Sequence, residues 1–83
     1  MNANLVILRA GDEMAASVND ELDVLLVVES GSGELVIDDK RYGIGSASVA
    51  LIPKGARRSI KSETGLAYYS IHQRPLDLSI SSV

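Results

Sequence analysis

The stretch that decides the fold is DVLLVVESGSGELVID, residues 23–38 of an 83-residue chain. Its first part, residues 23–29, is apolar on both faces of a strand, which is typical of strands covered on both sides. Ser30-Gly31-Ser32-Gly33 follows, and its glycines can adopt the positive φ angles of a chain reversal. We therefore predict a hairpin in which residues 34–38 return antiparallel to the first strand.

Short strands are also predicted on both sides of this hairpin, with no convincing helix between them. They cover residues 4–9, 14–18 (a weaker signal), 48–52, 57–61, 66–73 and 76–80, and Arg41-Tyr42 leads toward Gly43 between them. Turn residues separate them at 11–12, 38–40, 53–55, 62–65 and 74–75. About seven or eight short strands at this spacing are typical of a small all-β sandwich or barrel.

Composition sets the size and the core of this fold. A chain of 83 residues makes one domain, residues 1–83, and buries only roughly 60% of the surface that its unfolded form exposes. Cysteine, phenylalanine and tryptophan are absent, so the core consists of Val, Ile, Leu, Ala and three tyrosines. Without cysteine there is no disulfide and no thiolate metal ligand, as expected in a reducing compartment.

Charge and hydropathy exclude several partners. A formal net charge of -3 argues against a phosphate-binding surface for nucleic acid. The longest apolar run, residues 24–28, is far too short to cross a bilayer, and residues 1–4 lack the basic start and apolar stretch of a secretory signal. We expect a cytoplasmic protein that binds neither nucleic acid nor membrane.

Two motifs, in their order and spacing, resemble those of the cupin superfamily of small antiparallel jelly-roll barrels. If Gly31 is the glycine that ends the first motif, the glutamate position of that motif falls on Val24. Its two histidine positions fall on Ser17 and Asn19, or on Val18 and Asp20. The second motif, Pro-x-Gly-x-x-His, matches residues 53–58, with Ala47 at its preceding glycine position and Arg58 at its histidine position.

The resemblance extends to residues 65–74, which are similar to the closing strand of short bacterial cupins of uncharacterised function that also carry an Arg-Arg pair. It implies an all-β, small antiparallel jelly-roll barrel. Such barrels usually hold a metal, but His72 is the one histidine of this chain, and a transition metal wants at least three convergent ligands. We predict no metal and no cofactor, although His72 with a carboxylate such as Asp20 is an alternative.

Arg58 is the sharpest functional candidate, because it points into the barrel if it keeps the orientation of the histidine that it replaces. A buried guanidinium needs a partner, which can be an acidic ligand or, in a structural ion pair, Asp20 or Glu21. The plainer interpretation is that Arg57 and Arg58 form a solvated basic step at the rim of the barrel.

Strand alternation places Tyr68, Ser70 and His72 on one face of the closing strand and Tyr69 and Ile71 on the other. An inward polar set would form a pocket beside Arg58, so the candidate ligand-binding residues are Arg58, Tyr68, Ser70 and His72. Burying polar groups requires a partner for each. For that reason we expect Tyr69 and Ile71 in the core, with His72 at the surface or at a subunit contact.

These observations favour metal-free binding of a small polar or acidic molecule, and no residue is assigned a catalytic role. One alternative is a metal-independent isomerase or epimerase that uses His72 as its base, with Asp77 as partner. Another is a purely structural homo-oligomer. A homodimer is expected in each case, because residues 5–8 and 24–28 present more apolar surface than one short chain can cover.

Overall fold

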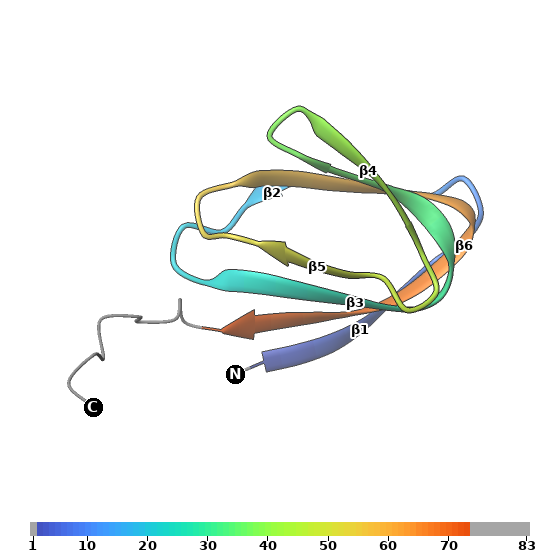
Figure 1. Cartoon of the computed structure of the whole chain (residues 1–83), viewed down its shortest axis with the longest axis horizontal. Helices are drawn as coiled ribbons and strands as arrows, with labels where there is room; N and C mark the ends of the chain where they lie inside the picture. Colours follow the sequence, from blue (N-terminus) through green and yellow to red (C-terminus); the bar gives the residue numbers. More distant parts are fainter. Residues whose placement is uncertain (1, 74–83) are drawn as a thin grey trace.

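The structure is a computed structural model and describes residues 2–73. These residues form six β-strands and no helix (Figure 1). The strands are β1 (Asn2–Leu8), β2 (Glu13–Val18), β3 (Asp23–Ile37), β4 (Lys40–Gly45), β5 (Val49–Ile52) and β6 (Arg57–Gln73). No helix that could span a membrane occurs in this part of the chain. The predicted strand at residues 76–80 lies outside the described residues.

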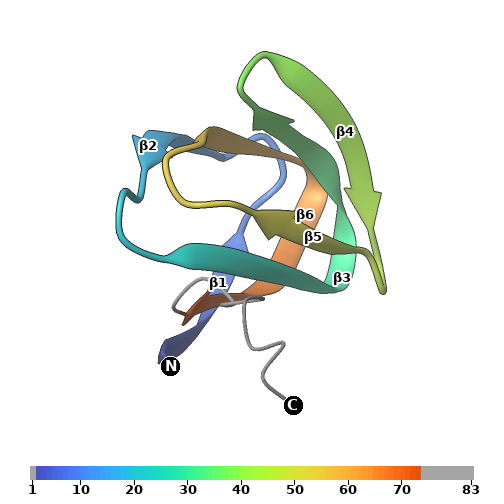
Figure 2. The ribbon, with the colours of Figure 1, turned by 60° about the vertical axis from the view of Figure 1, so that its left-hand side comes forward.

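The strands form one continuous antiparallel sheet that the two long strands, β3 and β6, fold into two facing layers (Figures 1 and 2). In the layer that we call the lower one, β1 and the first half of β3 flank the second half of β6, and β5 follows beyond β3. In the upper layer, β2 and the second half of β3 flank the first half of β6, and β4 follows beyond β3. This arrangement is the predicted jelly roll.

The hairpin predicted at residues 30–33 is wrong, because β3 continues through this segment as one bent strand. Gly31 has a φ of 91°. The pairing register between β3 and β6 changes before and after this residue, as it does at a β-bulge. A Cβ at Gly31 would overlap the carbonyl oxygen of Gly65, and one at Gly33 would overlap that of Lys61. The glycines therefore let two strands bend together at close approach rather than reverse the chain.

Residues 57–61 and 66–73, which are expected from the sequence to be separate strands, are likewise joined in β6. The predicted separator, residues 62–65, lies at the bend: Gly65 has a φ of 99° and donates its backbone N–H to Ser62 Oγ at 3.0 Å. Because two pairs of predicted strands are each a single strand and β4 adds a strand around residues 41–42, the described residues contain six strands.

The turn signals of the second motif are correct. Pro53-Lys54-Gly55 separates β5 from β6, and Gly55 has a φ of 84°. Ala47, which stands where the cupin motif has a glycine, has a φ of 70°. This left-handed conformation is one that glycine adopts without steric cost, which explains in physical terms why the motif has glycine there.

The core lies between the two layers and is aliphatic apart from Tyr68. Val24, Leu26 and Val28 of β3 are 1–3% exposed, and their register partners on β6 are His72, Ser70 and Tyr68. Residues paired directly across two strands project to the same face. The expectation that Tyr69 and Ile71 face the core is therefore wrong: Tyr69 is 39% exposed, whereas Tyr68 is 1% exposed.

Candidate functional site

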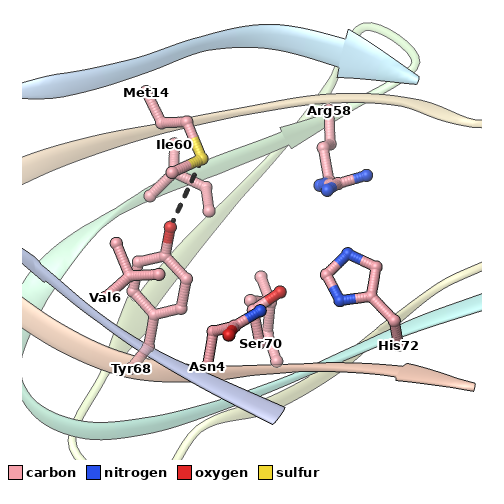
Figure 3. Close-up of a pocket in the computed structure, with 9 residues that line it drawn as sticks. Asn4, Val6, Met14, Arg58, Ile60, Tyr68, Ser70 and His72 are labelled. Atoms are coloured by element: carbon pink, nitrogen blue, oxygen red, sulfur yellow. Dashed lines mark hydrogen bonds between the residues drawn. The ribbon is translucent and has the colours of Figure 1, made fainter. Parts of the chain in front are cut away.

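A cavity of about 210 Å³ lies between the layers (Figure 3). The side chains around it come from four strands: Asn4 and Val6 (β1), Met14 (β2), Leu26 (β3), and Arg58, Ile60, Tyr68, Ser70 and His72 (β6). The structure thus brings the four predicted site residues to one cavity. Asn4, Val6, Met14, Leu26 and Ile60 were not predicted.

The register explains how these side chains meet. Asn4 and Val6 pair with Ser70 and Tyr68, and Met14 pairs with Ile60. Arg58 lies at the beginning of β6 and His72 near its end, and the bend of β6 places them on opposite layers. In Figure 3 the guanidinium of Arg58 and the imidazole of His72 point toward one another across the cavity.

The cavity has an apolar end and a polar end. Met14, Ile60, Val6 and the ring of Tyr68 gather at one end, and Arg58 and His72 lie at the other (Figure 3). Asn4 and Ser70 lie between them. A molecule bound here would therefore meet hydrogen-bonding groups at one end and hydrocarbon at the other.

Arg58 is half-buried and Arg57 is exposed. The interpretation that both arginines are solvated at the rim of the barrel therefore holds for Arg57 but not for Arg58. Within residues 2–73 the one ion pair joins Arg41 to Glu34, at 3.7 Å, on the surface. The proposed structural pair with Asp20 or Glu21 is therefore wrong. A half-buried guanidinium facing a cavity, with no carboxylate within 4 Å in this part of the chain, is suited to an anionic ligand.

Tyr68 remains a neutral phenol in this setting. Burial raises the pKa of its hydroxyl, and the positive charge of Arg58 partly opposes that rise. The hydroxyl donates to Met14 Sδ at 3.5 Å. Because this weak bond already occupies the Tyr68 donor, the apolar end of the cavity offers a ligand little hydrogen bonding.

The metal that cupins commonly hold does not fit these residues. Val24, at the glutamate position, is a hydrocarbon side chain that is 1% exposed, and Arg58, at a histidine position, is a cation. Within the described residues no group of three His, Cys, Asp or Glu side chains is placed to hold a metal ion. His72 beside an amide and hydroxyls makes a poor donor set for a transition metal.

Solved structures with this architecture include cupins. A cupin protein from Bacteroides fragilis superposes with a TM-score of 0.86 at 16% identity, over 93% of this chain and 68% of its own. A predicted oxalate decarboxylase from Thermotoga maritima gives 0.82 at 16% identity, over 88% and 65%. The Cnp3 cupin domain of Schizosaccharomyces pombe gives 0.79 at 21% identity, over 88% and 55%. At these identities the likeness establishes the cupin fold alone.

The family follows from the sequence match. The family model of the AraC-like ligand-binding domain matches residues 12–80, and the chain belongs to this family. No curated protein matches the sequence significantly. The chain spans 65% of the length of a structurally similar Streptococcus pyogenes protein of unknown function, at a TM-score of 0.82 and 17% identity. The predicted membership of the cupin superfamily is thereby confirmed.

Proposed function

We propose that this domain binds a small acidic molecule in the cavity between its layers, without a metal, and that Arg58 is the anchor. The observation that carries the proposal is the half-buried Arg58 guanidinium, which faces the cavity with no carboxylate within 4 Å in residues 2–73. Its planar fork of N–H donors matches a carboxylate in a bidentate arrangement. Membership of a family of ligand-binding domains supports the same function.

The surroundings strengthen this pairing. Leu26, Ile60 and Tyr68, at most 2% exposed, line the cavity and lower its effective dielectric constant. Ser70 and His72 line the cavity with Arg58 and could donate further hydrogen bonds. We therefore propose Arg58, Ser70 and His72 as the polar contacts of the ligand and Tyr68 as an apolar wall.

The proposal is tested by titrating small carboxylic acids into the purified domain by calorimetry. Removing a buried charge partner typically costs about 2–5 kcal/mol of binding, so Arg58→Ala should lower affinity by about 30-fold or more. Arg57→Ala is the matched control, because Arg57 is adjacent but exposed, and it should leave affinity unchanged. If His72→Ala abolished binding while Arg58→Ala did not, the assignment of the anchor would be wrong.

The alternative of an isomerase or epimerase has less support. A histidine base is usually oriented by a carboxylate, and no carboxylate lines the cavity within the described residues. Asp77, the partner considered for His72, lies outside those residues. Binding without catalysis is therefore the proposed function.

We also propose that the domain forms a homodimer, because the outer face of the lower layer is apolar across four strands. Its side chains are Ala3, Leu5, Ile7, Leu25, Val27, Val49, Leu51, Ala67, Tyr69 and Ile71. Exposure reaches 72% at Ile7, 63% at Val49 and 55% at Leu51. Asp23 and Glu29 lie at the two ends of the outward row of β3. An apolar centre with charged ends resembles a protein interface.

We propose a second copy of the chain as the partner of this face. At about 4.8 Å between strands and 6.7 Å between outward residues, ten residues cover roughly 320 Å² of sheet. That lies within the roughly 300–600 Å² of the largest patches on monomers, which are often functional. Two such faces pack symmetrically, sheet on sheet, about 10 Å apart.

Light scattering tests this assembly. We expect twice the 8.8 kDa chain mass at micromolar concentration, and Leu51→Glu should return the domain to a monomer. Val18→Glu is the control, because Val18 is similarly exposed, at 46%, but belongs to the upper layer. A monomeric wild-type protein would refute the dimer without affecting the ligand proposal.

A further inference from the structure

We infer that the ligand is a compact monocarboxylic acid with an apolar body, such as an aromatic ring, rather than a sugar or an inorganic anion. This inference rests on the proposed function and names the class of ligand for the same cavity. It is carried by three properties of the cavity: the separation of its polar and apolar ends, its volume, and its single guanidinium.

The separated ends argue against a polyhydroxylated ligand. At the apolar end lie Val6, Met14, Ile60 and the ring of Tyr68, whose hydroxyl already donates to Met14 Sδ. A sugar bound here would bury several hydroxyls without partners, which is unfavourable. A hydrocarbon body leaves no polar group unpaired, and a ring suits a methionine sulfur and a tyrosine ring as neighbours.

The volume sets the size of that body. A dry protein cavity of about 150 Å³ holds one benzene molecule. The present cavity has about 210 Å³. The difference, roughly 60 Å³, is about the volume of two water molecules in the liquid and accommodates one carboxylate group. Benzoate and a branched acid of similar size are therefore matched to the cavity.

The charge of the cavity sets the number of acidic groups. Arg58 is the one side chain of fixed positive charge among the residues that line it, and it lies at the polar end. One guanidinium pairs with one carboxylate in a bidentate arrangement. A second carboxylate on the same molecule would fall among Val6, Met14 and Ile60, where an unpaired charge is strongly disfavoured. The ligand is therefore a monoacid.

The test compares probes that differ in one property each, by calorimetry and thermal shift at neutral pH. Benzoate and cyclohexanecarboxylate should bind about tenfold or more tightly than acetate, because acetate leaves the apolar end unfilled. Benzamide, which has the ring without the charge, should bind at least tenfold more weakly than benzoate. Arabinose and inorganic phosphate should give no saturable binding.

Two variants separate the two ends of the cavity. Arg58→Met should abolish benzoate binding, and Met14→Gln, of similar length, should reduce the preference for benzoate over acetate. Tight, Arg58-dependent binding of phosphate or of a sugar acid, with none of benzoate, would overturn this inference and leave the proposed function standing. Anion binding unaffected by Arg58→Met would overturn both.

Discussion

Replacing Gly31 by alanine should nearly unfold the domain, and the structure indicates why. Two costs add at this position. A non-glycine residue at a φ of 91° is strained by about 1–3 kcal/mol. The new Cβ would also overlap the carbonyl oxygen of Gly65, a backbone atom that can move only if β3 and β6 separate. Losing one or two ladder hydrogen bonds there adds about 1–3 kcal/mol each.

The total, of the order of 5 kcal/mol, is large for this chain. At about 0.05–0.15 kcal/mol per residue, 83 residues provide roughly 4–12 kcal/mol of stability. Two other glycines separate the two costs. Gly55 has a φ of 84°, but a Cβ at this position would have nothing within 4 Å, so Gly55→Ala should cost about 1–2 kcal/mol. Gly43 has neither feature, so Gly43→Ala should stay within about 0.5 kcal/mol.

Urea unfolding followed by circular dichroism measures all three variants, because the free energy of unfolding falls linearly with denaturant. The expected order of destabilisation is Gly31→Ala, then Gly55→Ala, then Gly43→Ala. If Gly31→Ala cost no more than Gly55→Ala, the close approach of β3 and β6 would not be what requires glycine, and the account of the bend would be refuted.

Three further predictions concern the cavity. Arg58→Met should raise the free energy of unfolding of the ligand-free domain by about 1 kcal/mol and its Tm by about 4–8 °C, because the substitution removes a half-buried charge. If Arg58 formed a structural ion pair instead, the variant would have a lower Tm than wild type. Elemental analysis of purified protein should find no stoichiometric transition metal; one equivalent of zinc, iron or manganese per chain would contradict our interpretation of the motif. Burial raises the pKa of Tyr68 above the ordinary tyrosine value of 10.0, so its contribution to stability is complete below that pH and is lost as pH rises through the folded-state pKa. Tyr68→Phe should therefore lose less stability under alkaline conditions than wild type, whereas Tyr69→Phe, at an exposed position, should not.

Sequence reasoning succeeded where the structural requirement is local. The turn at residues 53–55 is predicted by the residues that form it, and so is the alternation that assigns Arg58 and Ile60 to one face. It failed at Gly31, because the positive φ angle there serves a contact with Gly65, a residue distant in sequence. Glycine signals a special backbone conformation but does not indicate whether the chain reverses or another strand passes close by.

The orientation of residues 66–73 was predicted wrongly for a related reason. Alternation defines two faces of a strand but not which one is inward. The more apolar face, with Tyr69 and Ile71, is the one expected in the core. The structure places that face outside, on the apolar surface that we propose as a dimer interface. The polar face with Ser70 and His72 lines the cavity instead. A rule that buries the more apolar face fails here, because the fold itself buries the other face.

The difference between Arg58 and the histidine of the cupin motif indicates what Arg58 contributes chemically. In the cupin motif this position holds a histidine that helps to bind a metal cation. Arginine places a positive charge on the protein itself. A cavity with Arg58 at one end can therefore attract an anion without a metal, and its apolar end then selects by size and shape. The loss of metal ligands and the gain of an inward arginine are thus consistent with one function, the recognition of a small acid.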